Sequence, residues 1–242
     1  MTALIIGATS EIAVALAKQL SLFGYNLQLA SRDTNALKTL AKDIEIRKGV
    51  SITLHEFDAL NFDQHHFFYE NLLVKPDLVI LVFGYLGNHS KAIEDWNESE
   101  RILNTNFIGA VSVLNVIAND FEIRRTGIIV GISSVAGERG RMSNYIYGSA
   151  KAGLTAYLSG LRNRLFHSGV HVLTVKPGFV RTKMTEGLVL PMPVTADPEQ
   201  VAKKIYTAIK KRKNVIYILP IWRVIIVVIV NMPETIFKKL KL

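Results

Sequence analysis

The sequence predicts a single α/β domain built on a doubly wound parallel sheet with helices on both faces. Two observations lead to this fold class. Short apolar runs alternate with helix-length segments along the chain, and each run is continuously apolar rather than alternating in polarity. Strands of that kind are buried on both faces, as in parallel sheets that helices cover. The length of 242 residues fits one such domain, since folds of this class often exceed 200 residues without dividing.

Seven of the apolar runs are expected to be strands, with helices between them. The strands are expected over residues 3–6, 27–30, 51–57, 78–83, 127–132, 170–175 and 215–219. The helices are expected over residues 12–23, a second segment ending near 46, then 62–72, 99–121, 144–167 and 198–212. In such a Rossmann fold, ligands bind at the carboxyl ends of the strands.

The C-terminal end is expected to extend the nucleotide-binding catalytic domain, residues 1–220, by a hydrophobic and basic tail, residues 221–242. The apolar segment around Pro220 is interrupted by Pro220 and Arg223, and its longest uninterrupted run is shorter than the roughly 20 residues of a membrane span. Residues 221–230 are expected to form a short apolar helix, and residues 235–242 a basic amphipathic end. The basic side chains of that end are Lys238, Lys239 and Lys241.

The net charge of +9 comes from the same region of the chain. Residues 201–242 carry ten Lys or Arg and one acid, Glu234, whereas residues 1–200 carry nineteen of each sign. This distribution argues against a nucleic-acid-binding protein and indicates an anionic partner near the tail. Because Trp222 and Arg223 suit a lipid interface, we expect an in-plane contact with anionic lipid. A helix buried between subunits is the alternative.

The cysteine content and the N-terminal segment indicate which compartment and which kinds of metal site to expect. The chain has no cysteine, which excludes disulfides, thiolate catalysis and cysteine-bound metals. The six histidines suggest no metal site, and none is expected. The N-terminal segment has no basic leader before its first apolar run. We therefore expect a cytoplasmic protein, peripheral at the inner face of the membrane.

The turn after the first strand has features of a nucleotide-binding turn. Gly7 allows a tight turn and close approach of a phosphate, and the following helix N-terminus offers unpaired N–H groups. A plain strand-to-helix turn would look similar, because Glu11 and Ala13 replace two of the three expected glycines. The residues expected to contact the cofactor here are Gly7, Thr9, Ser10, Glu11 and Ile12.

The second and third strands end in further candidates for cofactor contacts. Ser31 and Arg32 follow the second strand, where an arginine accommodates the 2′-phosphate of NADP. The guanidinium fork suits a phosphate, although a solvated loop arginine is the alternative. Asp58 follows the third strand, where it would reach the adenine or cap the next helix.

The central group of candidate catalytic residues is Asn106, Ser134, Tyr147 and Lys151. Ser134 follows the fifth strand, and Tyr147 and Lys151 share one helix face at i and i+4. A cation beside a phenol is expected to lower its pKa toward working pH. Such a tyrosine can protonate a ketone oxygen as hydride reaches the carbon, while Ser134 holds that oxygen. Asn106 would anchor a water in a proton relay, or only satisfy helix backbone.

Together these motifs resemble the short-chain dehydrogenase/reductase family over nearly the whole chain. The matching residues are Gly7-x5-Ala13, Asn106, Ser134, Tyr147-x3-Lys151 and Pro177-Gly178-x3-Thr182. The resemblance implies an NADP(H)-dependent oxidoreductase in which Lys151 also holds the nicotinamide ribose. It further implies that Pro177, Gly178, Val180 and Thr182 surround the nicotinamide. Where the family has Asn-Asn-Ala-Gly after the fourth strand, this chain has Leu81-Val82-Phe83-Gly84, so only Gly84 is kept.

A narrower resemblance connects the chain to one group within that family, the decaprenylphosphoryl-2-keto-pentose reductases of cell-wall arabinan synthesis. The similar segments are residues 7–12, 57–60, 83–87, 136–139 and 232–240. This resemblance implies a polyprenyl-phosphate-linked keto-sugar substrate and a flavin-dependent oxidase as partner. Arg139, Arg141 and Arg181 flank the predicted site and would bind the phosphodiester. Solvated loop charges are the alternative for each of them.

Two other functions remain open from the residues. One is a generic ketone or acyl reductase, which would use the same catalytic residues on another small-molecule substrate. The other is a catalytically silent NADP-binding scaffold, against which the complete set of four catalytic residues argues. Many members of the family are dimers or tetramers, so the resemblance also implies a homo-oligomer.

Overall fold

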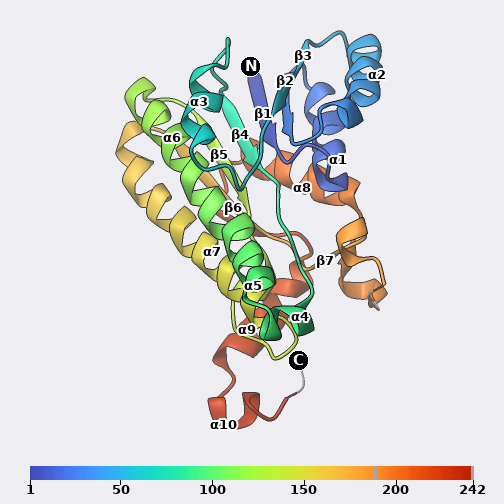
Figure 1. Cartoon of the computed structure of the whole chain (residues 1–242), viewed down its shortest axis with the longest axis vertical. Helices are drawn as coiled ribbons and strands as arrows, with labels where there is room; N and C mark the ends of the chain where they lie inside the picture. The colour runs from blue at the N-terminus through green and yellow to red at the C-terminus, as the bar shows by residue number, and fades with distance from the viewer. Residues whose placement is uncertain (188–189, 241–242) are drawn as a thin grey trace.

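The computed structural model describes residues 1–187 and 190–240. Its centre is a parallel sheet in the order β3-β2-β1-β4-β5-β6-β9 (Figure 1). These strands are β1 Thr2–Ile6, β2 Asn26–Ser31, β3 Ile52–Glu56, β4 Leu78–Leu81, β5 Ile128–Ile132, β6 His171–Lys176 and β9 Val215–Tyr217. Each of the seven expected strands is present, so the predicted fold class is confirmed. A separate pair, β7 Phe179–Val180 with β8 Thr195–Ala196, was not expected.

The helices up to α8 lie between strands along the chain, α9 and α10 follow the last strand, and helices cover both faces of the sheet (Figure 1). They are α1 Glu11–Ser21, α2 Lys38–Lys48, α3 Gln64–Glu70, α4 His89–Glu94, α5 Trp96–Leu103, α6 Gly109–Arg124, α7 Tyr145–Leu165, α8 Pro198–Lys210, α9 Pro220–Asn231 and α10 Glu234–Phe237. The basic end expected over residues 235–242 is helical only as far as Phe237, and Lys241 lies outside the described residues.

Two hydrophobic cores hold these layers together. Alternate strand residues such as Ile5 and Ile80 pack with α1, α2 and α8 on one face. Their neighbours, such as Leu4 and Val79, pack with α3, α6 and α7 on the other face. Because successive side chains of a strand point to opposite faces, a strand that is apolar throughout serves both cores. This explains why continuous apolar runs, and not alternating ones, marked the strands.

The helix expected over residues 99–121 is longer and interrupted. A π turn, Asn104–Ile108, joins α5 to α6. By length and composition alone the whole segment, Trp96–Arg124, is the one helix among the described residues that could cross a membrane. In the fold, however, α6 buries Val113, Ile117 and Phe121 completely against the sheet. We interpret it as a core helix of the α/β domain.

The C-terminal helix α9 closes a third, smaller cluster. Trp222 and Ile226 are buried there together with Val135. The expectation that Trp222 contacts lipid is therefore wrong. Its ring packs on Phe179 and its indole N–H donates to the Val194 carbonyl at 2.9 Å. The indole is held inside the protein because its one donor finds a buried acceptor.

Candidate active site

The candidate residues gather at the carboxyl edge of the sheet, around a cavity of about 700 Å³. Segments that follow β1, β4, β5 and β6 all contribute to its wall. The polar or glycine residues in that wall include Gly84, Ser134, Arg141, Tyr147, Lys151, Gly178 and Thr182. Parallel strands end on one side of a sheet, and this brings residues from positions 12 to 229 into one site.

Ser134 follows β5, and its position is fixed by the turn that comes after it. It caps a 3-10 turn, Val135–Gly137, and its hydroxyl accepts from the Ala136 N–H at 3.1 Å. The turn lies directly on α7, since a Cβ at Gly137 would come within 2.7 Å of the Ala152 nitrogen. This close approach sets the distance from Ser134 to the side chains of α7.

Tyr147 and Lys151 lie one helical turn apart on α7. The Lys151 ammonium lies 5.7 Å from the centre of the Tyr147 ring and donates to the Ile132 carbonyl at 3.2 Å. Ser133, next to Ser134, donates from its hydroxyl to the Lys151 carbonyl at 2.9 Å. The end of β5 thus holds α7 at the turn that carries both side chains.

The protonation of this pair differs from the expectation. Burial raises the pKa of Tyr147 to about 12, and a hydrogen bond with Ser134 offsets part of the rise. Burial also lowers the pKa of Lys151 to about 8. The expected lowering of the phenol pKa is therefore wrong for this structure, because desolvation raises the pKa by more than the hydrogen bond with Ser134 lowers it. At neutral pH Tyr147 carries its proton and is available as an acid.

Asn106 lies in the π turn between α5 and α6, and its polar atoms are engaged with the backbone. Its Oδ1 accepts from the Tyr85 N–H at 3.1 Å, and its Nδ2 donates to the carbonyls of Tyr85 and Ile102 at 2.6 and 2.8 Å. A Cβ added at Gly84 would lie 3.0 Å from Asn106 Oδ1 and 3.4 Å from Lys151 Nζ. Asn106 thus fixes the loop after β4 beside Lys151. Such π turns are frequent at functional sites.

The turn after β1 combines a left-handed glycine with the capped N-terminus of α1. Gly7 has φ +91°, and Ser10 caps α1 by accepting from the Ala13 N–H at 3.2 Å. Thr9 is exposed at this turn, and Ile12 lines the cavity. Glu11 accepts from the Lys183 N–H at 3.1 Å. It therefore connects α1 to the segment after β7, a role that the sequence did not suggest.

The ends of β2 and β3 lie farther along the same edge. Ser31 is buried and donates to the Asp33 carbonyl at 2.8 Å, while Arg32 is exposed. Asp58 accepts from the Leu60 N–H at 3.0 Å, which is a turn contact. Among the described residues Arg32 has no ion-pair partner, and it lies at the place where the sequence predicts the 2′-phosphate.

The segment after β6 forms another wall of the cavity. Pro177, Gly178, Val180 and Thr182 all line it. The Pro177 carbonyl accepts from the Val135 N–H at 2.9 Å, which joins this segment to the turn after Ser134. Trp222 packs so closely on Gly178 that a Cβ there would lie 1.9 Å from the indole. Helix α9 therefore supports the segment predicted to surround the nicotinamide.

The three arginines expected to bind substrate have different surroundings. Arg139 faces the tail: it donates to the carbonyls of Ile229 and Met232 at 2.5 and 2.7 Å and pairs with Glu234 at 2.6 Å. Its expected phosphate role is therefore corrected to an anchor of the C-terminal end of α9, whose last carbonyls lack helical donors. Arg181 is exposed, pairs with Asp197 at 3.0 Å and is not among the lining residues.

Only Arg141 lines the cavity. Its Nη2 donates to the Val135 carbonyl at 3.3 Å, but its buried Nε has no hydrogen-bond partner in the described structure. Burial lowers its pKa. Asn144, another lining residue, has a buried Oδ1 that is likewise without a partner. Buried polar groups are rarely left unpaired, so these two atoms can each take a hydrogen bond from or to a water or a polar ligand in the cavity.

Sequence reasoning missed the apolar part of the wall. Ile225 and Ile229 reach the cavity from α9, Leu86 from the loop after β4 and Met184 from the 3-10 turn Lys183–Thr185. No local pattern marks these residues, because the contact depends on how the tail folds back. Together the walls combine a proton donor, a cation and an apolar surface. This arrangement can bind a carbonyl compound and protonate its oxygen.

Comparison with known proteins agrees with this geometry. The model of the family described as short chain dehydrogenase matches residues 1–192. An uncharacterized oxidoreductase of Mycobacterium tuberculosis is 33% identical over 239 residues, covering 98% of this chain and 95% of that protein. The ketoacyl reductase HetN of Nostoc sp. is 29% identical over 218 residues, covering 87% and 76%. The short-chain dehydrogenase from Sphingobium yanoikuyae, solved in complex with NADPH, has a TM-score of 0.82 at 24% identity and covers 89% and 87%.

Proposed function

The chain belongs to the short-chain dehydrogenase family and is an oxidoreductase, and on this premise we propose that it reduces a keto group with NADPH. The observation that carries the proposal is the convergence of Ser134, Tyr147 and Lys151 on one cavity. Tyr147 is protonated at neutral pH, as an acid that completes ketone reduction must be.

The residues present fit a dinucleotide. The left-handed turn at Gly7 and the N-terminus of α1 suit the pyrophosphate, and Arg32 would hold the 2′-phosphate. Lys151 and the segment 177–182 would hold the nicotinamide ribose and ring. When bound, NADPH supplies a hydride to the carbonyl carbon.

The remaining steps belong to side chains of this protein. Ser134 would donate a hydrogen bond to the substrate oxygen and hold it beside Tyr147. As the carbonyl carbon is reduced, Tyr147 would give its proton to that oxygen, forming the alcohol. The Lys151 ammonium would stabilise the phenolate that remains, and Tyr147 would regain a proton from solvent.

The finer proposal concerns the substrate, a keto-sugar linked to polyprenyl phosphate in cell-envelope polysaccharide synthesis. Arg141 supports an anionic substrate, because this cation lines the cavity with its Nε unpaired. Ile225 and Ile229 support one with an apolar portion. A flavin-dependent oxidase would supply the ketone, and the enzyme would act at the cytoplasmic face of the membrane.

A ketoacyl reductase is the second candidate function. The apolar wall of the cavity suits an acyl chain equally well. A relative of this chain bears the name ketoacyl reductase, which favours that reading. The two candidates differ in the expected role of Arg141. The keto-sugar substrate carries a phosphodiester next to its reacting ring, whereas a ketoacyl thioester has no phosphate next to its keto group.

Replacing Arg141 with glutamine distinguishes the two substrates. We expect kcat/KM for farnesylphosphoryl-2-keto-pentose to fall about 10- to 100-fold, the loss of one charge-assisted hydrogen bond to a phosphate. A neutral cyclic ketone should be reduced at an unchanged rate. The measurement is NADPH oxidation followed by absorbance. Arg164→Gln, a surface arginine that pairs with Glu122, is the matched control. Equal losses on both substrates would contradict a phosphate contact by Arg141.

A further inference from the structure

Helix α9 is apolar on nearly all sides, but only one side is covered. Trp222, Ile225 and Ile229 face the active-site cavity. On another side Ile221, Val224 and Val228 are 43, 65 and 58% exposed. Helices that are apolar all round are normally buried in a core or in lipid. The exposed side therefore lacks the apolar surroundings that its composition calls for.

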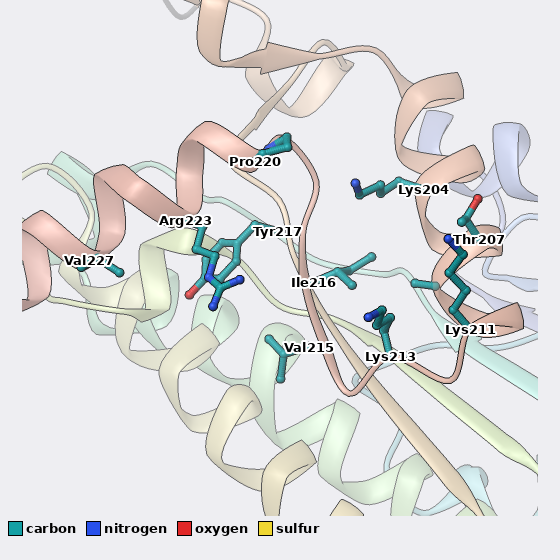
Figure 2. A pocket seen from close by; sticks show the side chains of 11 residues that line it. Lys204, Thr207, Lys211, Lys213, Val215, Ile216, Tyr217, Pro220, Arg223 and Val227 are labelled. Atoms are coloured by element: carbon teal, nitrogen blue, oxygen red, sulfur yellow. The ribbon is translucent and has the colours of Figure 1, made fainter.

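A third side of α9 borders a basic groove of about 670 Å³ (Figure 2). Pro220, Arg223 and Val227 form one wall of the groove, and Lys204 of α8 and Lys211, which directly follows that helix, form the opposite wall. Val215 and Ile216 of the edge strand β9, preceded by Lys213, lie between them. The groove thus has an apolar floor and cations on both sides.

The charge of this groove is unbalanced. None of its described lining residues is acidic, and Lys204, Lys211, Lys213 and Arg223 form no salt bridge within the described structure. The nearby acids are engaged elsewhere. Glu234 pairs with Arg139, and Glu138, which accepts from Tyr217, pairs with Lys176 at 2.6 Å. An anionic ligand would therefore meet four uncompensated cations beside an apolar helix.

A second copy of this chain fits the groove poorly. A twofold dimer brings the same patch of both subunits together. Here that contact would bring the four cations of one groove, Lys204, Lys211, Lys213 and Arg223, close to the four of the other, and like charges facing each other oppose association. An anionic surface with an apolar layer would attract these cations, whereas a second copy of the groove would repel them.

We propose that α9 and the basic groove form a docking surface for the head groups of an anionic phospholipid bilayer. The groove cations bind lipid phosphates, and Val224 and Val228 enter the interfacial layer beside them. Basic residues near an anionic leaflet and apolar side chains inserted at its surface both strengthen such binding. Since α9 also lines the catalytic cavity, docking places that wall at the bilayer. This last consequence rests on the proposed function, but the docking itself does not.

The test is co-flotation of the purified full-length protein with vesicles of phosphatidylcholine containing 30% phosphatidylglycerol. We expect wild type to float with these vesicles and to bind pure phosphatidylcholine at least 10-fold more weakly. Neutralising the groove as Lys204→Gln, Lys211→Gln, Lys213→Gln and Arg223→Gln should lower the partition coefficient at least 100-fold. A loss of about fivefold for each cation near the surface would amount to roughly 600-fold for all four, so 100-fold is the lower bound. Val224→Ser with Val228→Ser should also weaken binding.

The matched control removes four charges elsewhere, as Lys18→Gln, Lys38→Gln, Lys42→Gln and Lys48→Gln on the exposed faces of α1 and α2. Equal binding by the control and groove variants, or no flotation of wild type, would overturn the proposal. So would a wild-type dimer, measured by light scattering, that Val224→Ser and Val228→Ser dissociate. Reduction of a soluble ketone tests the proposed function separately, because it needs no vesicles.

Discussion

Tyr147→Phe is expected to lower kcat for ketone reduction by roughly 10²- to 10⁴-fold, the usual contribution of general acid catalysis. The substitution removes only the phenolic hydroxyl, so the ring keeps its place on α7 and NADPH affinity should change little. Among the described residues that line the cavity, no other side chain combines a proton retained at neutral pH with a position beside Ser134 and Lys151. The measurement is steady-state oxidation of NADPH with a saturating ketone.

Tyr145→Phe is the matched control for this variant. Tyr145 lies two residues away on the same helix, is 43% exposed and contacts His89 through its ring. Its loss should leave kcat within about twofold of wild type. A catalytically silent scaffold would show no turnover that Tyr147→Phe could remove. Wild-type rates in the Tyr147→Phe variant would contradict the assignment of the proton donor.

Gly7→Ala is expected to destabilise the protein and to weaken cofactor binding together. The backbone at Gly7 has φ +91°, a conformation that L side chains rarely adopt, and a Cβ there would lie 2.5 Å from the Phe83 nitrogen. Either the turn or the loop after β4 must move. Steric strain of this kind costs about 3 kcal/mol, which for a chain of this length lowers Tm by roughly 6–12 °C. We expect NADPH affinity to fall at least 10-fold, measured by fluorescence titration.

Gly24→Ala separates the two causes of that loss. Gly24 has φ +75° as well, but a Cβ there meets nothing within 4 Å. This variant carries the backbone strain without the collision, so its Tm should fall by less and its NADPH affinity should stay unchanged. Equal effects of the two substitutions would show that the contact with Phe83 does not shape the cofactor turn.

The fold was accessible from the sequence because it depends on local patterns. Strands buried on both faces read as continuous apolar runs, and helices of regular length separate them. The π turn at Asn104–Ile108 was not accessible, because a one-residue change in hydrogen-bonding register leaves no mark on hydrophobic periodicity. The short pair of β7 and β8 was missed for a similar reason, since two-residue strands are too short to show a pattern.

The meeting of Ser134, Tyr147 and Lys151 at one cavity was also predictable, because their spacing follows from helix geometry and strand ends. The surroundings of individual side chains were harder to predict from the sequence. Whether Arg139 meets substrate or the tail depends on where α9 folds back, ninety residues later in the chain. The pKa of Tyr147 depends on burial, which the spacing of Tyr147 and Lys151 does not report. Trp222 was assigned to lipid from its residue type, but its indole N–H found an acceptor inside the protein.

Titration of the wild-type protein with NADPH and NADH, followed by nicotinamide fluorescence, tests whether the site binds a dinucleotide and which of the two it prefers. Arg32 is exposed at the end of β2, where the 2′-phosphate is expected. We predict that NADPH binds about 10- to 100-fold more tightly than NADH, and that Arg32→Ala removes most of this preference. Binding of neither cofactor would contradict the account, because Gly7, Lys151 and the 177–182 segment would then form no dinucleotide site.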